Sequence, residues 1–117
     1  MKDFKELEVW KKSIDLVVEV YRLTKLLPDN EKYTLSDQIR RATISIPSII
    51  SEGFSRQTTK EYIQFLYIAL GSSAKLETQL ILTNRLHHTP IDSLIFQILN
   101  IRKMLSKLIS ILKRRLS

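Results

Sequence analysis

The 117-residue sequence contains no cysteine, only two glycines and three prolines, and a single tryptophan. Without cysteine there is neither a disulfide framework nor a thiolate metal site, which is typical of a reducing compartment. The purely apolar runs are a few residues long, far below the roughly 20 that a membrane span requires, and the N-terminal residues are too charged for a signal peptide. We therefore expect one cytoplasmic domain, residues 1–117, with no membrane association.

Scarce glycine, little alternation of apolar and polar residues, and repeated helix-start signals predict an all-α chain. Helix-capping residues, each followed three positions later by an acidic residue, stand at Asp3, Thr34, Thr58 and Thr89. They predict helices that end near Leu27, Gly53 and His87, with the last helix continuing to the C-terminal region. Short connections between four helices favour an antiparallel up-and-down four-helix bundle.

The spacing of apolar residues assigns a core face to each helix. In the first helix this face comprises Leu7, Trp10, Ile14, Val17, Tyr21 and Thr24. In the last helix it comprises Ile91, Leu94, Ile98, Ile101, Leu105, Leu108 and Leu112, in heptad register. Further apolar residues beside these faces exceed what a bundle core needs, so we assign them to contacts between subunits: Val9, Leu16, Val20, Leu23, Ile44 and Ile109. The alternative is a bundle that exposes some aliphatic side chains to water.

Pro47 lies inside the second predicted helix, in the stretch SIPSIISEG. Proline removes one backbone donor and its ring presses on the carbonyl of Thr43, so we expect the helix to kink there. The hydroxyls of Ser45, Ser48 and Ser51 can bond the freed carbonyls. Such a kink either wraps the helix around its core or shapes a groove or a subunit contact.

Gly71 lies inside the third predicted helix, in the stretch ALGSSA. Glycine there costs about 1 kcal/mol of helix propensity relative to alanine. We therefore expect another backbone to pass close by, either that of the second helix or that of a neighbouring subunit.

The sequence offers no constellation of catalytic or metal-binding residues. His87 and His88 are adjacent, so on a helix they point about 100° apart and cannot chelate one ion from one face. No nucleophile elbow, phosphate-binding glycine loop or zinc spacing is present in the sequence. We expect no enzymatic activity, no metal site and no cofactor.

Basic residues concentrate near the C-terminus. Residues 90–117 hold six of the 19 basic residues, with Asp92 as their single acidic companion. Such a stripe binds phosphate backbones through charge neutralisation and counterion release. We assign nucleic-acid binding to Arg102, Lys103, Lys107, Lys113, Arg114 and Arg115, with Arg40 and Arg41 as a second basic spot. The alternative is ordinary solvated charge, with the terminal cluster stabilising the helix dipole.

Several stretches together carry a family resemblance: FKELEVWKKSIDLVVEVY at residues 4–21, LSDQIRRATISIPSIISEG at 35–53, Arg56, Glu61, and FLYIALGSSAKLETQL at 65–80. On these residues the sequence resembles the bacterial 23S ribosomal RNA intervening-sequence proteins. It departs from the usual pattern at Ile49, where asparagine is common, and at Ser51, where alanine is common.

The resemblance implies an up-and-down bundle without enzymatic activity that assembles into a ring-like homo-oligomer, commonly a pentamer. A distant relative, the accessory variability determinant of diversity-generating retroelements, forms a basic pentameric barrel that binds nucleic acid and a reverse transcriptase. We therefore expect a non-catalytic homo-oligomer that binds RNA or DNA. The alternative is a protein-interaction scaffold that engages a partner enzyme through apolar surface.

Overall fold

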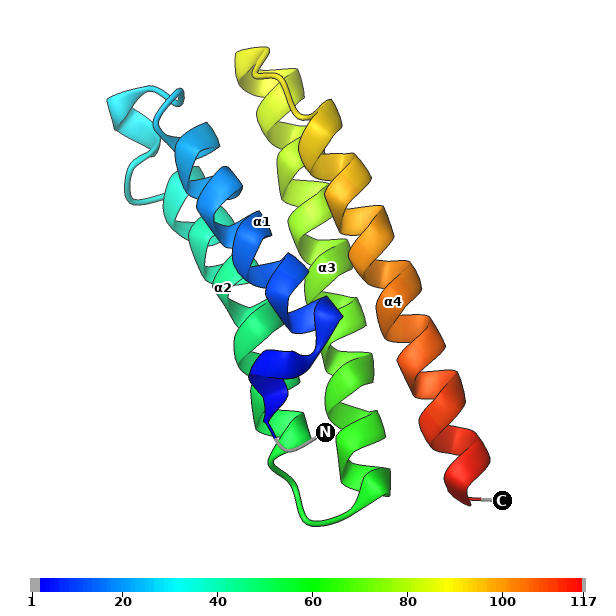
Figure 1. Ribbon diagram of the computed structural model, residues 1–117. Coiled ribbons are helices and arrows are strands. Elements are labelled where there is room, and N and C mark those ends of the chain that lie inside the picture. Colours follow the sequence, from blue (N-terminus) through cyan, green and yellow to red (C-terminus); the bar gives the residue numbers. More distant parts are fainter. Residues whose placement is uncertain (1–2, 117) are drawn as a thin grey trace.

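Four α-helices and two short 3-10 helices make up most of residues 3–116, the part of the chain that this computed structural model describes. They are η1 (Phe4–Glu6), α1 (Glu8–Thr24), η2 (Asp29–Glu31), α2 (Leu35–Phe54), α3 (Thr59–His87) and α4 (Asp92–Leu116). Each α-helix packs along the next, and α4 closes against α1 (Figure 1). The predicted all-α, up-and-down four-helix bundle is therefore confirmed.

The predicted capping residues have different outcomes. Thr58 caps α3 as expected, because its hydroxyl oxygen accepts the backbone N–H of Glu61 at 3.1 Å. Asp3 caps η1 instead of α1. Thr34 makes no side-chain cap to α2, and the buried hydroxyl of Thr89 has no partner among the described residues. The sequence thus located every helix start to within a few residues, whereas most of the individual caps differ.

The core between the four helices contains five of the six residues that the sequence assigns to subunit contacts. Val9, Leu16, Val20, Leu23 and Ile109 are each at most 6% exposed in the single chain. The interface prediction is wrong for these five residues, because the bundle itself already covers them. The sixth, Ile44, lies on the surface with 41% exposure.

The face of α1 is the source of this error. The helix buries the line that passes through Ser13 and Leu16, whereas Ile14, predicted to be in the core, is 37% exposed. Both faces of α1 are apolar enough to form a core, and the polar residue Ser13 lies within the face that is buried. Its hydroxyl donates to the carbonyl of Trp10 at 2.7 Å, so this polar side chain is buried with its hydrogen bond made.

α2 continues through Pro47 as one helix as far as Phe54. The hydroxyls of Ser45, Ser48 and Ser51 do donate to backbone carbonyls, at 2.6 to 2.9 Å. None of these three bonds goes to the carbonyl of Thr43, the group that Pro47 leaves without its helical donor. The serines satisfy neighbouring carbonyls, and the kink stays a prediction.

The two glycines differ in part from the roles that the sequence suggested. α2 ends at Phe54, one residue past the predicted stop, and a Cβ atom added at Gly53 would lie 2.6 Å from the Cβ of Phe65. Gly53 therefore lets α2 and α3 approach closely. At Gly71 an added Cβ would meet nothing within 4 Å among the described residues, so the close approach predicted there is wrong within this chain.

Candidate nucleic-acid interface

α4 buries a heptad line of leucine and isoleucine and presents its opposite face to water. The exposed residues at spacings of four and three along this opposite face are Phe96, Asn100, Lys103, Lys107, Ser110 and Arg114. These spacings keep the six side chains on one line parallel to the helix axis. We call this line the outer row.

The outer row combines cationic side chains with a helix that is poor in acid. Asp92, in the first turn, is the acidic residue of α4. At 1.5 Å per residue, Lys103 and Lys107 are separated by about 6 Å along the axis, and Arg114 lies about 10 Å further on. Within residues 3–116 neither Lys103 nor Lys107 has a carboxylate partner. Their positive charges are thus available to an anion in solvent.

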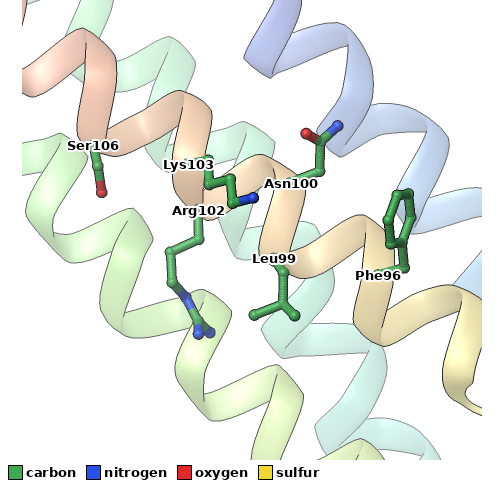
Figure 2. A pocket seen from close by; sticks show the side chains of 6 residues that line it. All are labelled: Phe96, Leu99, Asn100, Arg102, Lys103 and Ser106. Atoms are coloured by element: carbon green, nitrogen blue, oxygen red, sulfur yellow. The ribbon is translucent and has the colours of Figure 1, made fainter.

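Arg102, predicted to be in the phosphate-binding set, belongs to the α3–α4 contact. Its Nη2 donates to the Glu77 carboxylate at 2.9 Å and its Nε to the Ser73 hydroxyl at 3.2 Å. Figure 2 shows its guanidinium extending toward α3, away from Asn100 and Lys103. Because Glu77 balances its charge, Arg102 is a weak candidate for phosphate contact.

The C-terminal basic residues lie beside aromatic residues of α3. Lys113 places its Nζ atom 5.1 Å from the centre of the Tyr67 ring, a cation–π contact. Burial raises the pKa of Tyr62 to about 12, while the positive charge of Arg115 acts in the opposite direction. The contact between Lys113 and Tyr67 joins the C-terminal end of α4 to the N-terminal half of α3.

Arg40 and Arg41 do not join the outer row. Arg40 donates to the Thr24 hydroxyl at 3.1 Å, and its guanidinium lies 5.0 Å from the centre of the Tyr21 ring. Arg41 donates to the Asp37 carboxylate at 2.9 Å, as an exposed pair one turn apart. Within residues 3–116, no Cα atom of α2 lies within 8 Å of a Cα atom of α4, so the two helices are diagonal in the bundle. The chain therefore carries two separate basic spots.

A surface hollow lies on the same side of α4. It measures about 510 Å³, and its lining residues Phe96, Leu99, Asn100, Arg102, Lys103 and Ser106 all come from α4 (Figure 2). Since a single helix lines it, it is a shallow depression, not an enclosed pocket. Sequence reasoning missed Phe96 and Asn100, although their heptad distance from Lys103 and Lys107 already placed them on the same face.

His87 contacts a carboxylate from another element of the bundle. Nε2 of His87 lies 2.7 Å from the Glu31 carboxylate, which links the end of α3 to η2. Hydrogen bonds from Thr34 and His87 lower the pKa of Glu31 below its usual value. Nowhere in residues 3–116 do three His, Asp or Glu side chains gather as ligands. Nor is any described helix long and apolar enough to cross a membrane.

These features define a small helical bundle with a basic outer face on its last helix. The family model of the 23S rRNA-intervening sequence protein matches residues 5–107. The chain belongs to this family. A crystal structure of a protein with unknown function from the S23 ribosomal protein family of Bacteroides thetaiotaomicron is similar, with 30% identity and a TM-score of 0.79, over 86% of this chain and 97% of that one. No curated protein matches the chain.

Proposed function

We propose that this protein is a non-catalytic, cytoplasmic bundle that binds nucleic acid, RNA in the first place, through phosphate contacts along the outer row of α4. One observation carries the proposal: Lys103 and Lys107 are exposed on one face of a helix whose acidic residue, Asp92, lies several turns away. Arg114 extends the same line toward the C-terminus.

Phosphate binding fits this arrangement physically. Each phosphate that a lysine neutralises releases counterions, so affinity falls steeply as salt rises. A row of cations on a straight helix can follow a strand over several nucleotides without reading bases. Lys113 and Arg115 extend the positive field at the end of α4, whereas Arg102 contributes less because Glu77 pairs with it. Arg40 and Arg41 belong to a separate spot and are at most a second contact.

The test is charge reversal with a matched control. Lys103→Glu combined with Lys107→Glu is compared with Lys60→Glu combined with Lys75→Glu, which changes the net charge equally on the exposed surface of α3. We measure RNA binding by fluorescence anisotropy over a series of salt concentrations.

We expect the α4 double variant to bind weakly, with a smaller slope of log affinity against log salt. For a single strand the slope decreases by about 0.7 for each phosphate that the protein no longer neutralises. The α3 variant should keep most of the affinity and slope. Equal losses in both variants would show that only net charge matters and would refute the assignment to α4.

We also propose that the bundle acts as a homo-oligomer, a pentamer if it follows the resemblance. Apolar side chains remain exposed on two sides of the single chain. One set lies on α1 and α2 and the other on α3: Ile14, Val18 and Ile44; Tyr67, Ile68, Ile81, Leu82 and Leu86. Two different apolar surfaces suit a head-to-tail contact, which closes into a ring when the rotation permits. Light scattering at low and high salt measures the mass, and a monomer at both would refute this proposal.

The same exposed apolar side chains support a second function, a scaffold that binds a partner protein. Apolar docking keeps or gains strength in structure-stabilising salts such as sulfate, whereas phosphate contacts weaken. A partner retained at high salt by the wild-type protein and by the Lys103→Glu, Lys107→Glu variant would favour the scaffold.

A further inference from the structure

Phe96 is the one aromatic residue of α4, and its side chain is 74% exposed. It stands at the N-terminal end of the outer row, and among residues 3–116 no ring or cation stacks on it. A phenyl ring left in water contributes nothing to the core of this bundle. The ring therefore offers a flat apolar surface that a ligand can cover.

The neighbours of Phe96 in the outer row indicate the chemistry of that ligand. Asn100 lies one turn from Phe96, and Lys103 lies two turns away on the same line (Figure 2). The row thus presents a ring face, then an amide that can both donate and accept a hydrogen bond, then a cation. Nucleic-acid grooves for unpaired strands combine a positively charged track with aromatic platforms on which bases stack.

The rise of the helix gives these groups a fitting separation. Phe96 and Lys103 lie about 10 Å apart along the axis, and Lys107 follows about 6 Å further on. A strand whose phosphates contact Lys103 and Lys107 can therefore place a neighbouring base over Phe96. Bases inside a duplex are stacked on each other and do not offer a free face.

We propose that Phe96 is a stacking platform for an unpaired base, so that α4 binds single-stranded nucleic acid in preference to duplex. This inference rests on the proposed function, because the phosphates must follow the lysines of the same row. Asp92 lies at the Phe96 end of α4, and Asp15 of α1 lines a hollow beside Phe96 together with Lys12, whose positive charge opposes that of Asp15. Lys103 and Lys107 thus remain cations of the row that face solvent, and the Phe96 end offers an uncharged ring to the base.

A second copy of this chain is the alternative partner that could cover the phenyl ring of Phe96. Two copies meeting through their outer rows would bring Lys103 and Lys107 of one against the same lysines of the other, and like charges in contact repel. Charge therefore favours a polyanion over a symmetric contact between copies. The mass of the protein in solution distinguishes the two.

The experiment compares two probes with identical phosphates: a single-stranded RNA of mixed sequence and an abasic strand of the same length. The variants are Phe96→Ala and Phe96→Trp, with Tyr33→Ala as the control, because Tyr33 is also a highly exposed aromatic residue but lies outside α4. Since Phe96 is mostly exposed, its replacement leaves the core intact. Binding is measured by anisotropy and mass by light scattering.

We expect Phe96→Ala to weaken binding of the base-bearing strand roughly 5- to 150-fold, the range of a single stacked base, and to leave the abasic strand unaffected. Phe96→Trp should restore affinity, and its added tryptophan fluorescence should be quenched by the base-bearing strand alone. Tyr33→Ala should bind like the wild type.

Each other outcome identifies what fails. If Phe96→Ala binds both strands like the wild type while reversal of Lys103 and Lys107 abolishes binding, stacking is wrong and the phosphate proposal stands. If the wild type binds neither strand, the proposed function fails and stacking fails with it. If Phe96→Ala lowers the mass of the protein without changing affinity, the ring lies in a contact between copies, which also overturns the stacking proposal.

Discussion

Replacing glycine with alanine should have opposite effects on stability at Gly53 and at Gly71. In Gly53→Ala the new Cβ would lie 2.6 Å from the Cβ of Phe65 and 3.3 Å from a ring carbon of Tyr62. Carbon atoms pack favourably at about 3.5 to 4.0 Å, so α2 and α3 must separate by about 1 Å. Because the contact is with a Cβ and not with the end of a flexible side chain, rotation about side-chain bonds cannot relieve it.

The magnitude follows from two opposing effects. Overpacking of this kind costs about 1–3 kcal/mol, and replacing a helical glycine with alanine returns about 1 kcal/mol. Gly53→Ala should therefore lower the free energy of unfolding by about 0–2 kcal/mol. Gly71→Ala gains the propensity without the clash, because its Cβ would enter open space, so it should raise stability by about 1 kcal/mol.

Urea denaturation followed by far-UV circular dichroism measures both variants. Protein concentration must be matched, since assembly into an oligomer raises apparent stability. The expected difference between the two variants is about 1–3 kcal/mol. If Gly53→Ala stabilised the protein as much as Gly71→Ala, the close approach of α2 and α3 at this residue would be refuted.

Three further predictions concern the core and two ionisable groups, all measured by urea denaturation. Leu16→Ala should lower the free energy of unfolding by about 2–5 kcal/mol because Leu16 is fully buried. Val18→Ala should stay within about 0.5 kcal/mol of the wild type because Val18 is exposed. The reverse order would show that the other face of α1 packs in the core. Tyr62→Phe should not destabilise the protein, because the buried hydroxyl has no partner among the described residues. Since the pKa of Tyr62 is raised to about 12, wild-type stability should fall from about pH 10 toward pH 12, and a fall of equal size in Tyr62→Phe would contradict this cause. The pKa of Glu31 is lower in the folded protein than its usual value of 4.5, so Glu31→Gln should be less stable than the wild type at neutral pH. The two stabilities should become equal as pH falls below 4.5 and through the folded pKa. A difference in stability that persists in acid would contradict the argument.

The buried face of a helix could be predicted from the sequence where the helix has one apolar face, but not where it has two. The heptad line from Ile91, just before α4, to Leu112 within it was predicted, and all of it is buried except Leu108, which is partly covered. In α1 two apolar lines compete, and the buried one includes Ser13. Only contact with the neighbouring helices decides between them, and that information is not local to α1.

In the candidate site, too, local spacing predicted some features, while others depend on packing between helices. Exposed cations on one face of α4 were predictable from spacing, and Lys103 and Lys107 occupy the expected face. The role of Arg102 was not, because its partner Glu77 lies 25 residues earlier in the chain and meets it only through the packing of α3 on α4. Phe96 was overlooked since an aromatic residue on an apolar-rich helix is more often part of a core.

The outer row and the buried line of α4 share one seven-residue repeat, and this couples the evolution of the surface to that of the interior. Inserting one residue between Phe96 and Arg114 would turn everything that follows by about 100°, moving lysines toward the core and leucines toward water. An insertion of seven residues would preserve both faces and lengthen the row by about 10 Å. Homologues that contact a longer ligand through this helix should therefore differ in length by whole heptads.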